Sequence, residues 1–461
     1  MMFQSDSNII TSLAFLLFQV IPEERTADWA RAGLPAMPAR SRIVEVRGDP
    51  QAAIDAAAPD DILLLPAGWY DGLRLKSRIT LRGEGPTKTI LKGPIHIGLG
   101  GADWWYPHRL RVDVQGRRGD GELRCDASKL KAGMVVQLAR GVDFLQRQVT
   151  QVVATTPTSV TVSPAPLFDL PEGSRLAPAG RMAEFVGVED LAVEDTGPIG
   201  INITGGYGCW VKNVSVSNIK YCHISMSDSL FCEIRRCTIS TRSEGGTDGA
   251  GIMLGTSSFC KIEDNLLVEQ FPHLAVSASS GNVIAYNYCR DSDIYGVLGP
   301  SISSNPQPQS SFNLYEGNVS PKFQADGHHG GGTHDTVFRN RLHGTSTTTP
   351  KLWICVNLNR STRNASIVGN VLGAPGHPWF YDNAEKGNLI FSFGDPEVRR
   401  SAILKGNFNW KDAGVPAAEA VDSLPKSLYL KSKPDWFGDL AWPPFGPDVA
   451  FQKSKIPAET R

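Results

Sequence analysis

One short pattern recurs eight times between residues 209 and 407, and it constrains the fold more than any other feature of the chain. Each copy has an apolar residue two positions after its start, and six of the eight copies place an asparagine three positions later. Successive starts are 22 to 37 residues apart. A fixed minimum with longer variants is typical of a solenoid, whose repeats share one core and differ in their loops. The copies start at Cys209, Cys232, Cys260, Asn282, Asn313, Asp335, Ala365 and Ala402.

Apolar residues alternate within each copy, as in Val211, Val214 and Val216, with one extra step at a corner. This spacing predicts strands rather than helices. Because two or three short strands cannot bury an apolar face alone, successive copies must stack in parallel, ~4.8 Å apart. We therefore predict an all-β, right-handed parallel β-helix, since parallel crossovers are almost always right-handed. The recurring asparagines are expected to form one inward ladder, each amide bonding the next: Asn265, Asn287, Asn318, Asn340, Asn370 and Asn407.

The rest of the chain divides around this solenoid. A short amphipathic helix from Gly48 is expected to cap its open end, and the hairpin pattern after residue 100 predicts a small inserted β subdomain. The expected regions are an apolar segment at 1–22, an extended lead-in at 23–43, the cap and first rungs at 44–100, the insert at 101–180, the β-helix at 181–410 and a Pro- and aromatic-rich tail at 411–461.

Two segments carry a resemblance to known proteins. The opening AIDAAAPDDILLLPAGWYDG, followed by ITLRGEGPTKTIL, resembles the start of right-handed β-helix proteins of the pectin-lyase-like (pectate lyase) superfamily. The later phrases GNVIAYNY, FNLYEGN and TVFRN resemble those of an uncharacterised bacterial branch of these proteins. The resemblance covers nearly the whole chain and implies the fold and a carbohydrate-active protein. It implies no single reaction, because the superfamily holds many activities.

Charge and apolar patterning limit the partners and the location. The formal net charge is −1, and no Lys/Arg cluster is interleaved with aromatics, which argues against nucleic acid and anionic membranes. The apolar run Ile9–Ile21 is too short to span a bilayer and suits the core of a signal peptide, although no Lys or Arg precedes it. We expect a secreted or periplasmic monomer without a membrane span.

Long connections between copies predict a groove. The surplus residues Thr241–Gly251, Arg290–Ser311 and Thr345–Arg363 all follow the asparagine corner, so we expect them to project from one side. A wall beside a long sheet suits a linear polymer, and ten Trp and ten Tyr are available to stack on sugar rings. The sequence therefore predicts a polysaccharide as substrate.

The densest group of titratable residues lies in Lys322–His334, and we predict the functional centre where it meets the Arg290–Ser311 bulge. A solvated polar loop is the competing interpretation. The three histidines of this segment lack a carboxylate at metal-site spacing, so we predict no metal site and no cofactor, with Ca²⁺ left open. The catalytic candidates are His329, His334, Asp326 and Arg290, and the substrate-binding candidates are Asp293, Tyr295, Glu316, Lys322, His328, Arg339, His273 and His223.

Several chemistries compete for this site. A polysaccharide lyase removes the proton α to a uronate carboxylate, with Arg290 or Arg339 to neutralise that carboxylate and His329 or His334 as base. A glycoside hydrolase of the polygalacturonase type needs two or three carboxylates around the scissile bond. An epimerase shares the proton abstraction of the lyase, and a carbohydrate-binding or adhesive solenoid needs none of it. We predict a lyase acting by β-elimination.

Overall fold

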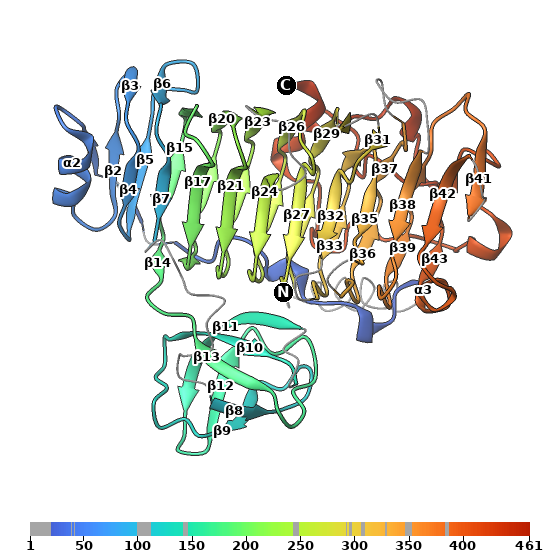
Figure 1. Cartoon of the computed structure of the whole chain (residues 1–461), viewed down its shortest axis with the longest axis horizontal. Coiled ribbons are helices and arrows are strands. Elements are labelled where there is room, and N and C mark those ends of the chain that lie inside the picture. Colours follow the sequence, from blue (N-terminus) through green and yellow to red (C-terminus); the bar gives the residue numbers. More distant parts are fainter. Residues whose placement is uncertain are drawn as a thin grey trace, which may run out of the picture.

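The computed structural model describes residues 20–37, 39–40, 42–98, 112–141, 146–242, 249–291, 293–294, 297–305, 309–327, 330–345, 353–382 and 387–461. Three long parallel sheets stack rung upon rung along one axis (Figure 1). Each complete rung contributes strands to all three sheets, in the chain order A, B, C. The predicted fold class, a right-handed parallel β-helix with a capping helix and an inserted β subdomain, is confirmed.

The sheets have these members. Sheet A contains β1 (Ile43–Glu45), β2 (Asp61–Leu64), β5 (Ile79–Arg82), β15 (Gly187–Glu189), β19 (Trp210–Lys212), β22 (Glu233–Arg235), β25 (Lys261–Glu263), β28 (Val283–Ala285), β33 (Leu314–Glu316), β36 (Thr336–Phe338), β39 (Ser366–Val368) and β43 (Ile403–Lys405). Sheet B contains β3 (Gly68–Tyr70), β6 (Thr89–Leu91), β16 (Ala192–Glu194), β20 (Ser215–Ile219), β23 (Thr238–Arg242), β26 (Leu266–Val268), β29 (Tyr288–Arg290), β34 (Val319–Ser320), β37 (Arg341–Leu342), β40 (Val371–Leu372) and β44 (Phe408–Asn409). Sheet C contains β4 (Leu73–Leu75), β7 (Ile95–Ile97), β17 (Ile199–Thr204), β21 (Cys222–Ser227), β24 (Ala250–Gly255), β27 (Leu274–Ser277), β32 (Ile302–Asn305), β35 (Phe323–Ala325), β38 (Ile354–Leu358), β42 (Asn388–Phe393) and β41 (Trp379–Asp382).

The corner where sheet A passes into sheet B is lined by the six asparagines of the repeat. Each side-chain amide donates to the Oδ1 atom of the next rung's asparagine at 2.9–3.0 Å, from Asn265 to Asn407. The last amide, on Asn407, donates at 3.1 Å to the Glu419 carboxylate of the C-terminal tail. Every buried amide of the column thus has a partner, which a buried polar group requires.

The corner where sheet C passes into sheet A holds a second column, formed by the first residue of successive copies of the repeat. Asn282 donates its side-chain amide to Asn313, and Asn313 donates to the Asp335 carboxylate, at 2.9 and 3.1 Å. Toward the N-terminal rungs the same position is occupied by Cys232 and Cys260, whose sulfur atoms accept backbone N–H groups. All eight cysteines are buried and free, so they fill the core as small side chains.

Two described segments outside the rungs, the N-terminal lead-in and the C-terminal tail, cover the solenoid. The N-terminal lead-in, with η1 (Glu23–Arg25) and η2 (Trp29–Arg31), runs along the C–A corner in blue in Figure 1. Trp29 donates its indole N–H to the Phe312 carbonyl at 2.7 Å, and the N–H of Gly33 donates to the Phe259 carbonyl at 2.9 Å. The C-terminal tail, with η3 (Ala417–Glu419), η4 (Asp435–Phe437), η5 (Phe451–Lys453) and η6 (Pro457–Thr460), packs on the outer face of sheet A. No helix in the described part of the chain is long and apolar enough to cross a membrane.

Helix α2 (Pro50–Ala56) begins after Asp49, whose carboxylate accepts the Gln51 N–H and caps it. The insert is a closed antiparallel barrel that lies beside the C–A corner (Figure 1). Its strands are β8 (Val112–Gln115), β9 (Glu122–Cys125), β10 (Val135–Ala139), β11 (Arg147–Thr155), β12 (Ser159–Ser163) and β13 (Arg175–Pro178). The smaller remaining elements are β14 (Ala183–Glu184) paired with β18 (Gly206–Tyr207), the hairpin of β30 (Asp293–Ile294) and β31 (Val297–Leu298), and α3 (Pro396–Ser401).

Deleting the barrel should leave a solenoid that unfolds cooperatively. Strands β5, β6 and β7 pair directly with β15, β16 and β17, so the rungs are continuous across the insertion. A short glycine linker from Gly98 to Ala183 would close the gap. We expect a loss of several kcal/mol, because Phe231, Phe259 and Phe312 pack with the barrel and would be exposed. Urea unfolding beside the full chain measures this; a variant with no cooperative transition would contradict it.

Candidate functional site

Two predicted substrate-binding residues and one predicted catalytic residue meet where sheet B passes into sheet C, which we call the B–C edge. Arg290 ends β29, whose Tyr288 pairs with Val319 of β34, so Arg290 lies one rung from Lys322. The buried His273 donates its Nε2–H to the Arg290 carbonyl at 2.7 Å, and its Nδ1 accepts from the Ser301 hydroxyl at 2.9 Å. The structure therefore brings Arg290, Lys322 and His273 together.

His223 lies at the same edge, several rungs toward the N-terminus. Its Nε2 is 3.0 and 3.1 Å from the carbonyl oxygens of Ser240 and Thr241 on the next rung. His223 and His273 thus occupy equivalent positions and brace the B–C connections from inside, since both are fully buried. Their burial suits a positioning role for the edge.

Lys322 is the one cation of this group without an acidic partner among the described residues, since Arg290 forms an ion pair with Asp291 at 3.3 Å. Lys322 is 6% exposed. Loss of solvation lowers its pKa to about 8. A buried ammonium without a partner is unfavourable. An anionic ligand group at this position would remove that penalty.

The connections of the B–C edge differ in length around Lys322. Its own connection, 321–322, has two residues, whereas the neighbouring connections 291–301 and 343–353 have eleven each. Side chains at the equivalent position in the preceding rungs, His273 and Ser301, contact the last residue of the sheet B strand in the following rung, Arg290 and Ser320. By register, the Lys322 side chain occupies the position equivalent to those of His273 and Ser301 in its own rung.

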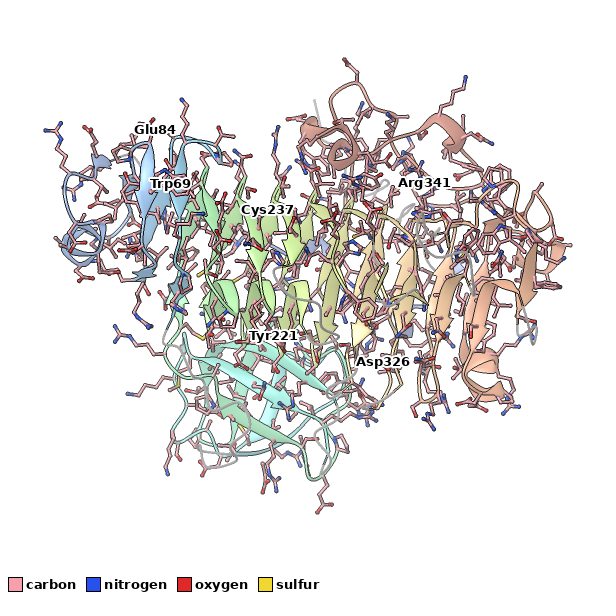
Figure 2. All side chains as sticks on the ribbon, turned by 45° about the horizontal axis from the view of Figure 1, so that its top comes forward. Trp69, Glu84, Tyr221, Cys237, Asp326 and Arg341 are labelled. Carbon is pink, nitrogen blue, oxygen red and sulfur yellow. The ribbon has the colours of Figure 1, made fainter. Side chains whose placement is uncertain are left out.

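The outer face of sheet C carries a mixed row of side chains next to this edge. Side chains alternate along a strand, so Gln324 and Asp326 face outward while Phe323 and Ala325 face the core. The Asn357 amide donates to the Gln324 side-chain Oε1 at 3.2 Å across adjacent rungs. The row runs through Ser225, Met253, Ala275, Ser303, Gln324 and Asn357. Ser225, Gln324 and Asn357 are its partly exposed polar members. Asp326 directly follows this strand on the side of the C–A corner, as Figure 2 shows.

His334 lies at the C–A corner, on the opposite edge of sheet C from Arg290. Its ring stacks on Phe312 with centroids 4.7 Å apart, and its two nitrogens contact Thr333 Oγ1 and Asn364 Nδ2 at 2.8 and 3.2 Å. Burial, followed by the nearby charges of Arg25 and Arg118, lowers its pKa to about 4. The His334 imidazole is therefore neutral at pH 7, and both of its nitrogens are hydrogen-bonded. The structure does not place it near Arg290.

Glu316 and Arg339 lie on sheet A beneath the C-terminal tail. The Glu316 carboxylate accepts the Leu428 N–H at 2.8 Å and the Tyr286 hydroxyl at 3.1 Å, and burial raises its pKa to about 7. Arg339 is 1% exposed and donates two hydrogen bonds of 2.7 Å to Asp448. Both side chains hold the tail in place, and neither faces sheet C.

The other candidates lie outside what the structure describes. These are His328, His329, Tyr295 and the side chain of Asp293. Their roles stay predictions from the sequence. Within the described residues, no three His, Cys, Asp or Glu side chains are grouped as metal ligands would be.

Sequence reasoning missed Gln324, Asn357 and Trp353, which border the same edge. The sequence pattern could have identified Gln324 and Asn357, because both are outward-facing positions of strands that directly follow a B–C connection. The register that aligns them, Gln324 beside Asn357, becomes visible only when the rungs are stacked.

Comparison with known proteins addresses the fold. Residues 181–349 match the family model described as "Right handed beta helix region". No curated protein matches the chain. Similar solved structures include tailspike gp61 of Pseudomonas phage phi297, which is 15% identical, with 79% of this chain and 75% of that chain covered and a TM-score of 0.48. The alginate lyase from Paenibacillus sp. str. FPU-7 is 12% identical, with 78% and 99% covered and a TM-score of 0.40.

Pectate lyase Pel9A is also 12% identical, with 85% of each chain covered and a TM-score of 0.41. These likenesses are distant. The family match over residues 181–349 and the three parallel sheets agree with each other. This chain is therefore a right-handed parallel β-helix protein, the fold that its resemblance to the pectin-lyase-like superfamily implies.

Proposed function

We propose that this protein is a carbohydrate-active enzyme that binds a uronic-acid-containing polysaccharide over the outer face of sheet C and cleaves it by β-elimination. The observation that carries the proposal is the Lys322 ammonium, buried at the B–C edge without an acidic partner among the described residues and one rung from Arg290. Lys322, with Arg290 one rung away, places cationic side chains at the edge of sheet C, which suits a carboxylated polymer. A secreted or periplasmic monomer remains part of this proposal.

The chemistry assigns separate tasks to separate groups. A base takes the proton from the carbon α to the uronate carboxylate, and the electron pair left behind is delocalised into that carboxylate. The C–O bond to the leaving sugar then breaks, which yields a C=C bond on one product and, after protonation of the leaving oxygen, a free sugar end on the other. Lys322 and Arg290 are proposed to neutralise the carboxylate, where the charge develops. His329 stays the proposed base from the sequence.

Hydrolysis is less well supported on this face. A glycosidase needs two carboxyl groups about 5–9.5 Å apart around the bond. On the outward rows of sheet C from β21 to β38, Asp326 is the only carboxylate within the residues that the structure describes. At the B–C edge, Arg290 forms an ion pair with Asp291 at 3.3 Å, whereas Lys322 has no acidic partner among the described residues. The edge thus keeps one uncompensated cation, which favours elimination.

The test is incubation of the purified protein with polygalacturonate, alginate and a neutral polymer. Ultraviolet absorbance reports the unsaturated product, and a reducing-sugar assay reports new chain ends. Elimination raises both signals on a uronate polymer and neither on the neutral one. Reducing ends without absorbance would replace the lyase by a hydrolase, and no signal together with retained polymer binding would indicate a non-catalytic binding protein.

A further inference from the structure

We propose that Trp353, with His377 beside it, forms a platform that stacks on a pyranose ring of the bound polymer, so that the polymer lies along the solenoid axis at the B–C edge. This inference rests on the proposed function in one respect, the position of the uronate carboxylate at Lys322. It adds a binding subsite, a ligand class for that subsite and a direction for the polymer.

The platform lies on the rung that follows Lys322. Trp353 directly precedes β38, and Phe323 of β35 pairs with Val356 of β38, so Lys322 lies beside Cys355, two residues from Trp353. Adjacent rungs are ~4.8 Å apart. A ring stacked on Trp353 therefore belongs to the same stretch of polymer as a carboxylate bound by Lys322.

The backbone of Trp353 is held in place from the next rung. Its carbonyl accepts the Leu389 N–H at 2.7 Å, and its N–H donates to the Asn388 side chain at 3.4 Å. A stacking residue must be fixed before the ligand arrives, because ordering it on binding would reduce the affinity. Trp353 meets this condition.

Three aromatic rings form the platform and its support. The Trp353 ring lies 4.7 Å from the His377 ring, edge to face at 83°, and 6.4 Å from the Trp379 ring. Trp379 is 6% exposed and donates its indole N–H to the Ala374 carbonyl at 2.8 Å. Trp353 is half-buried, and His377 is exposed. The cluster thus has one buried ring, Trp379, one partly buried ring, Trp353, which also packs against the main core, and one exposed ring, His377.

Close contacts at Gly344 join the aromatic cluster to the backbone segment that precedes Lys322. The Gly344 N–H donates to the carbonyl of Pro321, the residue before Lys322, at 2.8 Å. A Cβ atom at Gly344 would lie 2.6 Å from the Trp379 ring and 2.7 Å from the Cys355 sulfur, so only glycine fits there. The edge therefore carries a cation and an indole on adjacent rungs, a pair that matches the carboxylate and the apolar ring face of a uronate sugar.

The test compares Trp353→Ala, Trp353→Phe and His377→Ala with Trp69→Ala. Trp69 is a matched control, since its ring is 64% exposed on sheet B near the far end of the solenoid (Figure 2). Retardation in gels cast with polygalacturonate or alginate measures binding, and product absorbance gives KM and kcat. We expect Trp353→Ala to weaken binding and raise KM roughly tenfold with kcat little changed. His377→Ala should have a smaller effect in the same direction, and Trp353→Phe and Trp69→Ala little effect.

The outcomes separate this inference from the proposed function. Wild-type KM and retardation in both Trp353→Ala and His377→Ala overturn the platform, even if elimination is observed. Lost retardation in Trp353→Ala, in a protein that produces no unsaturated sugar, supports the platform and rejects the lyase. A wild-type protein that neither polymer retards overturns the platform as well. If Trp353→Ala fails to fold, the KM and the gel retardation of His377→Ala decide the question, because His377 is exposed.

Discussion

Replacing Lys322 by methionine is expected to raise the free energy of unfolding at pH 7 and to abolish cleavage of the polymer. Methionine keeps the apolar stem and removes an ammonium that is 6% exposed and without an acidic partner among the residues described. Removing such a charge should stabilise the chain by about 1–3 kcal/mol. Loss of carboxylate neutralisation should reduce turnover by roughly 10²-fold or more. Urea unfolding and the absorbance assay measure the two effects.

The gain in unfolding free energy from Lys322→Met should decrease as the pH rises. The folded-state pKa of Lys322, about 8, lies below its ordinary value of 10.5. Between these values the unfolded chain binds a proton that the folded chain has released, so wild-type stability rises with pH in this window. The unfolding free energy that Lys322→Met gains over the wild type is therefore complete below pH 8 and vanishes above pH 10.5. Cleavage, which needs the charged form, should fall as the pH rises through about 8.

Lys405→Met is the matched control, because Lys405 is exposed on β43. It should change neither stability nor cleavage. Activity retained in Lys322→Met would remove Lys322 from the site, and a destabilised Lys322→Met would show that its ammonium has a favourable partner in the folded chain.

Replacing Asn318 by leucine should cost about 3–5 kcal/mol of unfolding free energy. Its Oδ1 accepts the backbone N–H and the side-chain amide of Asn287, both at 3.0 Å, and its own amide donates to Asn340 at 2.9 Å. Leucine leaves the donors of Asn287 buried without an acceptor, and each unsatisfied group costs about 1–3 kcal/mol. Denaturant unfolding measures the loss.

Asn202→Leu provides the comparison, since Asn202 is half-exposed on the outer face of β17. Its replacement should change stability by less than 1 kcal/mol. Equal losses in the two variants would mean that the hydrogen bonds of the buried column contribute little.

The sequence predicted the parts of the fold that repeat. One asparagine per copy is enough to place the A–B corner, because stacked rungs put equivalent residues on top of each other. At the C–A corner the sequence predicts the inward cysteines, but the hydrogen bonds along the column escaped prediction because cysteine, asparagine and aspartate share it. The paths of the lead-in and the tail also escaped, since neither segment has a period and both are placed by tertiary packing.

The candidate site was predicted in part. Arg290, Lys322 and His273 lie at one edge, because all three follow or precede a B–C connection. His334 was grouped with Lys322 because both belong to one segment, but an extended strand carries the chain ~3.3 Å per residue and moves its ends to opposite edges of the sheet. Arg339 has the sequence pattern of a solvent-exposed corner, yet the tail buries it.

Hydrogen–deuterium exchange with and without a short uronate oligomer tests most directly whether the B–C edge binds the substrate. Saturating oligogalacturonate and oligomannuronate are the probes, followed by mass spectrometry of peptides. Our account predicts slower exchange in peptides that span residues 320–327, 341–345 and 353–358, with sheet A peptides beneath the tail unchanged. Protection confined to the barrel or the tail, with none at the B–C edge, would contradict it.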